Sequence, residues 1–156
     1  MRRKIRSGFS IVLLFVLVLG ACATRPYVQK EGSVLKLVEA INNGEAAARE
    51  LAEAPFIFDG EIILMQNHLT ILWTNLHRAG FRMSEASIVR SEPVTENSWR
   101  EFGDSFDVKT FFEKYLDRDT SLVEIKARSG SYIFLLNRER NGYPLIQGFK
   151  GGLLVK

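Results

Sequence analysis

Residues 121–150 read SLVEIKARSGSYIFLLNRERNGYPLIQGFK, and this stretch decides the fold class. Apolar and charged residues alternate over 123–128, which is the pattern of a strand with one face in solvent. Two continuous apolar runs follow, each after a tight turn containing glycine, which readily adopts the positive φ of short hairpin loops. Strands joined by tight turns pair antiparallel. We therefore expect three antiparallel strands, at 123–127, 132–136 and 145–149, with turns at Ser129-Gly130 and Asn141-Gly142.

The sequence before residue 121 has mostly the period of amphipathic helices. Over 62–79 the apolar residues are spaced by threes and fours, and Gly80 follows where a left-handed helix cap belongs. Additional apolar residues at Leu64, Ile71 and Trp73 widen the buried face, which predicts a helix clasped by a curved sheet. Shorter helices are predicted at 33–42, 45–54 and 106–117, short strands at 56–58 and 85–91, and a loop at 95–104.

The two short N-terminal helices have recognisable ends. Ser33 suits an N-cap, because its hydroxyl can accept a hydrogen bond from the first helical turn. Asn42-Asn43-Gly44 is expected to stop the first helix. Pro55 is expected to end the second, because the residue before proline disfavours the helical conformation. Together with the three strands, these helices predict a single α+β domain over 33–156.

This order of elements resembles the cystatin-like fold of the nuclear-transport-factor-two and ketosteroid-isomerase superfamily. The resemblance covers residues 33–152. Ile41-Asn42-Asn43-Gly44-Glu45 is similar to the first interhelix turn of that family, and Leu145-Ile146-Gln147-Gly148-Phe149 is similar to its last strand. The resemblance implies a cone in which a long helix is clasped by a curved antiparallel sheet, with two short N-terminal helices. Such a cone can hold either a ligand cavity or a solid core.

The amino terminus has the order of a secretory signal peptide. Four basic residues lie within the first six positions, and an apolar run at 9–19 follows. As a helix this run rises about 17 Å, whereas a bilayer core is about 30 Å thick. We therefore expect the run to be removed with the leader rather than kept as a membrane span.

Cys22 is the only cysteine of the chain and follows Leu19-Gly20-Ala21, so this segment resembles the lipobox of bacterial lipoproteins. The resemblance implies cleavage between Ala21 and Cys22, diacylglyceryl transfer to the Cys22 sulfur, and acylation of the new amino group, for example with palmitate. Two or three acyl chains hold a protein stably at a membrane. The alternative is an ordinary secreted protein that is cut after Ala21 and keeps Cys22 as a free thiol.

Residues 22–32 lack apolar periodicity and are expected to form a tether with a maximum reach of about 35 Å. In enteric-type sorting, an Asp after the lipidated cysteine would favour the inner membrane. This chain has Ala23 there, which favours the outer membrane of a bacterial cell envelope on its periplasmic or surface side. The chain thus divides into a signal peptide at 1–21, a tether at 22–32 and one domain at 33–156.

The net charge of +3 does not indicate a nucleic-acid partner. Without the four basic residues of the leader, 17 basic residues stand against 18 acidic ones, so no basic excess is left in the mature chain. A single cysteine cannot form an internal disulfide and is too few for a cysteine-based zinc site. We expect neither a metal nor a cofactor.

No residue pattern predicts catalysis. His68 and His77 lie nine positions apart, half a turn around the predicted helix, and therefore cannot share a metal ion. Asp59 follows strand 56–58, where a turn or N-cap role is expected rather than that of a catalytic carboxylate. A ketosteroid-isomerase-type site also needs an oxyanion donor across an apolar pocket, and nothing singles out Tyr132 or Tyr143 for that role.

Aromatic residues are dense between positions 99 and 115. The packing of a small helix explains this density, and the alternative is an exposed partner-binding face formed by Trp99, Phe111 and Phe112. We expect a membrane-anchored lipoprotein without enzymatic activity that binds a partner protein or an envelope component. The alternative is a binder of a small apolar ligand, or a ketosteroid-isomerase-like enzyme, with a cavity in the cone.

Overall fold

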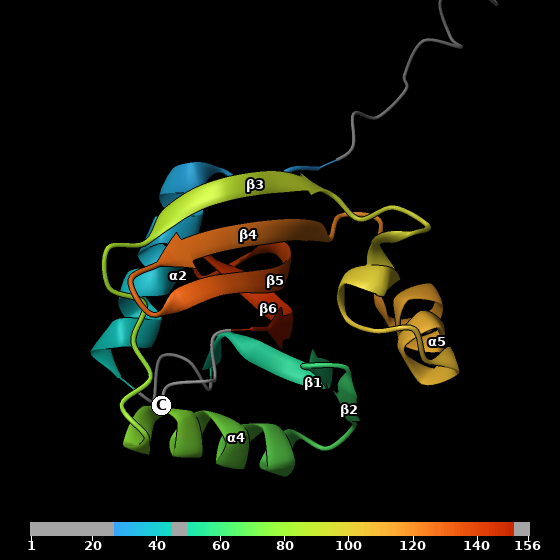
Figure 1. Cartoon of the computed structure of the whole chain (residues 1–156), viewed down its shortest axis with the longest axis horizontal. Helices are drawn as coiled ribbons and strands as arrows, with labels where there is room; N and C mark the ends of the chain where they lie inside the picture. Colours follow the sequence, from blue (N-terminus) through green and yellow to red (C-terminus); the bar gives the residue numbers. More distant parts are fainter. Residues whose placement is uncertain (1–26, 45–49, 152–156) are drawn as a thin grey trace, which may run out of the picture.

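The structure is a computed structural model that describes residues 27–44 and 50–151. It is an α+β fold with one six-stranded sheet, as the sequence predicts for the class (Figure 1). In chain order the elements are α2 (Glu31–Asn43), β1 (Ala52–Phe58), β2 (Glu61–Ile63), α4 (Gln66–Arg78), β3 (Ser87–Pro93), the 3-10 helix η1 (Ser98–Glu101), α5 (Phe106–Tyr115), β4 (Ser121–Ala127), β5 (Gly130–Arg140) and β6 (Tyr143–Lys150).

The sheet has the strand order β2-β1-β6-β5-β4-β3 and is mixed. The predicted meander is confirmed, because β4 pairs antiparallel with β5 and β5 pairs antiparallel with β6. The expectation of a wholly antiparallel sheet is wrong, because β1 lies parallel to β6, with Ile57 opposite Gly148. Tight turns reveal antiparallel neighbours in the sequence, whereas this pairing joins segments about ninety residues apart.

Helices cover both faces of the sheet (Figure 1). On one face, α2 packs against β6 and α4 packs against β1, and together they close the larger core. On the opposite face, η1 and α5 cover a smaller core, which includes Ile57 of β1, Leu122 of β4 and Leu135 of β5. The predicted helix at 106–117 thus exists as α5 and supplies the cover of this second face.

The hairpin turns follow the expected chemistry. Asn141 and Gly142 both have positive φ, 55° and 83°, as a two-residue loop between β5 and β6 requires. The β4–β5 turn lies one residue earlier than predicted, because Ala127 pairs with Gly130 and leaves Arg128 and Ser129 as the loop.

The long helix begins later than its apolar spacing predicts. Residues 61–63 form β2, which pairs with β1 across a turn in which Asp59 and Gly60 have φ values of 49° and 91°. The helix α4 then covers 66–78 and ends as expected, with the amide of Gly80 donating to the carbonyl of His77. Hence the Asp-Gly turn outweighs the helical period, because in the hairpin Ile63 packs against the larger core and Ile62 against the smaller one.

Other predicted boundaries also move. The first helix begins at Glu31, so Ser33 lies in its first turn and not at the N-cap. The predicted helix at 45–54 is wrong over 52–54, which belong to β1, while 45–49 lie outside the described residues. Leu64 and Ile71 are exposed, 63% and 54%, and do not widen the buried face of α4, although Trp73 does.

Candidate functional site

The structure does not bring Trp99, Phe111 and Phe112 together as an exposed face. Phe111 is fully buried and Phe112 is 9% exposed, while Trp99 is half-buried. Phe111 and Phe112 are covered by their own domain and cannot contact a partner, whereas Trp99 remains partly accessible. For Phe111 and Phe112 the other explanation holds, because both side chains pack in the core beneath α5.

The local sequence explains why α5 presents these rings to the sheet. The Ser105 hydroxyl accepts a hydrogen bond from the amide of Val108, which fixes the start of the helix. The buried side chains of α5, Val108, Phe111 and Phe112, follow at positions i, i+3 and i+4 and so form one stripe. Two aromatic residues of α5 remain exposed, Phe106 by 81% and Tyr115 by 42%. They lie nine positions apart, half a turn around the helix, and therefore form no continuous surface.

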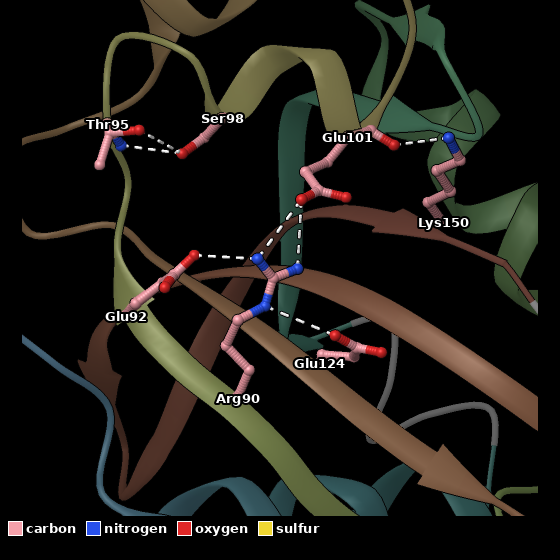
Figure 2. A network of polar contacts seen from close by, with 7 residues as sticks. All are labelled: Arg90, Glu92, Thr95, Ser98, Glu101, Glu124 and Lys150. Atoms are coloured by element: carbon pink, nitrogen blue, oxygen red, sulfur yellow. Dashed lines mark hydrogen bonds and ion pairs between the residues drawn. The ribbon is translucent and has the colours of Figure 1, made fainter.

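A charged network centred on Arg90 joins η1 to the sheet (Figure 2). The Arg90 guanidinium lies on β3 and makes ion pairs with three carboxylates, at 3.1 Å to Glu92, 3.2 Å to Glu101 and 3.4 Å to Glu124. The Lys150 ammonium donates to the backbone carbonyl of Glu101 from β6. Glu101 of η1 is thus held by side chains from two strands, β3 and β6. These contacts fix the position of η1, and with it α5, over the sheet.

The pKa of Arg90 is raised above its ordinary value. Burial acts to lower this pKa, but the hydrogen bond from Arg90 to Glu101 and the charges of Glu101, Glu92 and Glu124 outweigh it. The guanidinium is therefore charged at any physiological pH. Among the residues that the structure describes, no group of three or more His, Cys, Asp and Glu side chains is arranged to hold a metal ion. The contacts of this network join η1 to β3 and β6.

The space between α4 and the sheet, where a cone would hold a ligand, is occupied by aromatic side chains. Phe149 on β6 lies at the centre, with five ring centroids between 4.8 and 6.2 Å from its own. These rings come from β1, α4, the segment after α4, and β5: Phe58, Trp73, Phe81, Tyr132 and Phe134. Such packing is typical of a solid core.

Few polar groups reach this aromatic core. The Tyr132 hydroxyl is paired with the Ser129 hydroxyl at 2.6 Å, at the end of the β4–β5 hairpin. The indole nitrogen of Trp73 is buried without a hydrogen-bond partner. Over 27–44 and 50–151, the buried polar residues include no Asp or Glu. A general base of the ketosteroid-isomerase type is thus not provided by the interior of the described fold.

The other predicted candidates occupy ordinary structural positions. Asp59 forms the β1–β2 turn, in agreement with the turn role expected of it. His68 is exposed on α4, and His77 lies beside Arg82, with 3.4 Å between the ring nitrogen and the guanidinium. Tyr143 is half-buried at the start of β6, where it packs against the larger core.

A surface hollow of about 450 Å³ lies between α2 and the β5–β6 turn, away from the aromatic core. Its lining is mostly polar and includes Lys36, Glu39, Asn43 and Asn141. Glu39 and Lys36 are exposed to solvent. The hollow therefore lacks the enclosed apolar walls that small-molecule sites usually have.

Residues 27–30, which we call the strap, were expected to belong to the tether, but they pack against three strands of the sheet. The Ser121 hydroxyl of β4 donates to the carbonyl of Tyr27 at 3.2 Å. The Ser91 hydroxyl of β3 donates to the carbonyl of Gln29 at 3.4 Å. The Gln29 amide donates to the carbonyl of Asn137 on β5 at 2.6 Å. The predicted tether at 22–32 is thus too long at its carboxyl end.

Gln29 is the residue that fixes the strap most firmly. It is only 4% exposed, and its amide also lies 3.4 Å from the carbonyl of Leu136. The Tyr27 hydroxyl donates back to the Gln29 side-chain oxygen at 3.4 Å. Sequence reasoning missed this contact, because one glutamine in a polar stretch has no periodic signal. Only the tertiary structure shows that its partners are backbone carbonyls more than a hundred residues away.

The predicted lipidation site, Cys22, and the cleavage position after Ala21 lie outside the described residues. Over the part of the chain that the structure describes, no helix is long and apolar enough to cross a membrane. No protein-family model matches this chain, and neither a curated protein nor a solved structure matches it significantly.

Proposed function

We propose that this chain is a bacterial lipoprotein whose leader is removed before Cys22 and whose folded domain is held at the envelope membrane by lipid on that residue. The observation that carries the proposal is in the sequence. A basic segment, an apolar run of eleven residues and Leu19-Gly20-Ala21 stand directly before the only cysteine of the chain. The outer membrane is the favoured location, because Ala23 rather than Asp follows Cys22.

The anchored domain acts by binding a partner protein or an envelope component, without catalysing a reaction. Two features of the described residues support this part of the proposal. The core around Phe149 is filled by side chains, which leaves little room for a substrate at the centre of the fold. The buried polar residues that are described include no carboxylate that could serve as a base.

The domain belongs, in this proposal, to the cystatin-like class. The order of elements, from a first helix through a hairpin and a long helix to an antiparallel meander, supports it. So does the position of α4, which lies across one face of the sheet (Figure 1). The filled core then makes the domain a solid member of that class rather than one with a ligand cavity.

The test is metabolic labelling with a fatty acid in a bacterial host. The native chain is expected to take up label and to begin at residue 22, whereas Cys22→Ser takes up none. Thr24→Ala serves as the matched control and keeps the label, because it changes the same segment without removing the sulfur. A labelled Cys22→Ser protein, or an unacylated native chain that begins at Met1, would contradict the proposal.

The location is tested separately by density fractionation of inner and outer membranes. In a host with enteric-type sorting, the native chain is expected in the outer membrane and Ala23→Asp in the inner membrane. Both proteins are expected to take up the fatty-acid label, so that a change of membrane cannot be explained by loss of the lipid. Equal distribution of the two labelled proteins would overturn the assignment to the outer membrane.

A further inference from the structure

The strap changes how far the folded domain can move from a lipid on Cys22. Residues 23–26 separate Cys22 from Tyr27, which is the first described residue and is bound to the sheet. Five Cα–Cα steps span at most about 17 Å, which is about half of the reach of a tether that continued to residue 32. A domain of this size has a radius of gyration of about 14 Å, so its diameter of roughly 35 Å exceeds the reach of the tether.

The strap is held too firmly to serve as spare tether. Releasing it would expose Gln29 and break its hydrogen bonds to the carbonyls of Leu136 and Asn137. The hydroxyls of Ser91 and Ser121 bind the backbone of the same segment. The chain therefore leaves the domain at one fixed point.

That point lies at one side of the molecule. The strap contacts β3, β4 and β5, whereas α4 packs on β1 and β2 at the other end of the sheet. Figure 1 shows the first described residues beside β3 and α4 on the opposite side of the sheet. Three strand spacings separate β4 from β1, or about 14 Å, and α4 adds a further layer.

We propose that the surface around the strap faces the bilayer that holds Cys22, and that α4 is turned away from it. This surface consists of Tyr27, Val28, Arg138 and the loop 116–119, in which Arg118 stands between Asp117 and Asp119. The inference rests on the proposed lipidation of Cys22. The occupant of the surface is the headgroup layer of that membrane, because the tether is too short for the domain to turn over.

The surface carries charges of both signs, and its amphipathic side chains suit a headgroup layer. The Arg138 guanidinium lies 5.9 Å from the centre of the Tyr27 ring and forms a 2.9 Å ion pair with Asp119. Tyrosine and arginine both combine an apolar body with a polar end, which favours them at membrane interfaces. Val28 is 41% exposed and adds an apolar contact. On the far side, the exposed face of α4 with Ile71 remains accessible to a partner.

The test places one fluorescent probe on each side of the lipidated protein. Because Cys22 is the only cysteine and its sulfur carries lipid, Arg118→Cys and Asn75→Cys each provide a single free thiol. Both residues are exposed, Arg118 near the strap and Asn75 on α4. The proteins are inserted into vesicles of phosphatidylethanolamine and phosphatidylglycerol that contain a lipid with a nitroxide on its headgroup. This quencher acts over a short range, and a soluble quencher corrects for differences in probe exposure.

We expect the headgroup nitroxide to quench the probe at position 118 several-fold more strongly than the probe at position 75. Inserting about ten Gly and Ser residues between Pro26 and Tyr27 lengthens the tether and is expected to bring the two values close together. Equal quenching with the native tether, or a difference that the insertion leaves unchanged, would overturn the orientation. Failure of lipidation would be seen separately, because the protein would then not float with the vesicles.

Discussion

Phe111 and Phe106 lie on the same helix and provide a matched pair of substitutions. Phe111 is fully buried and packs with Phe112 and Tyr115, whose ring centroids lie 6.2 and 5.7 Å from its own. Phe106 is 81% exposed. Transfer of a Phe side chain from water contributes about 1.5–3 kcal/mol, and the cavity left on truncation brings the cost of Phe111→Ala to about 3–5 kcal/mol. Phe106→Ala is expected to change stability by less than about 0.5 kcal/mol.

The assay is equilibrium urea unfolding of the Cys22→Ser protein, followed by the fluorescence of the buried Trp73. With a slope of about 2 kcal/mol per molar urea, Phe111→Ala lowers the midpoint by about 1.5–2.5 M and Phe106→Ala leaves it in place. If Phe111→Ala is unfolded without urea, Phe111→Leu gives a smaller loss of about 1 kcal/mol. Equal midpoints for the two alanine variants would refute the conclusion that the inner side of α5 is core.

Two further predictions concern the sheet and the strap. A Cβ on Gly148 would lie 2.6 Å from Cγ2 of Ile57 and 2.8 Å from Cδ1 of Leu135, so Gly148→Ala is expected to lose about 1–3 kcal/mol by overpacking. Its control Gly32→Ala meets nothing within 4 Å and stays within about 1 kcal/mol of the native protein; equal urea midpoints for the two would contradict this packing. Burial, followed by the negative charge of Glu139, raises the pKa of Tyr27. The pKa of Tyr27 is thus higher in the folded than in the unfolded chain. The stability that the neutral phenol contributes is therefore complete below the ordinary tyrosine pKa and is lost as pH rises through the folded-state pKa. Urea midpoints between about pH 8 and pH 11 should thus fall less steeply for Tyr27→Phe than for the native chain, and parallel curves would show that this phenol does not couple to folding.

The folding of the C-terminal third could be predicted because its signals are local. Alternation over β4 and the turn at Asn141-Gly142 fix antiparallel neighbours without any distant contact. The amphipathic stripe of α5 and the cap at Gly80 are local in the same sense. The helical spacing at 62–65 was misleading, because a strand of three residues is too short to establish its own period against that of the following helix.

The candidate sites also include features that the sequence can predict and features that it cannot. The proposed leader, the sole cysteine after it and the lack of a metal or nucleophile motif can be read from the sequence alone, because these are patterns of neighbouring residues. The sequence does not indicate which aromatic residues are buried, since Phe106 and Phe111 have the same side chain and differ only in the side of α5 on which they lie.

The sequence by itself determined the α+β class, the meander and the basis for a lipid anchor, since hydrophobic period, turn residues and the order of the leader are properties of short segments. Only the tertiary structure decided that β1 joins β6 in parallel, that Arg90 binds η1 to the sheet, and that Gln29 binds residues 27–30 to β5. These are contacts between residues that are distant in the chain. The energy of these contacts depends on a geometry that exists only after the sheet has formed. Patterns of neighbouring residues therefore cannot predict them.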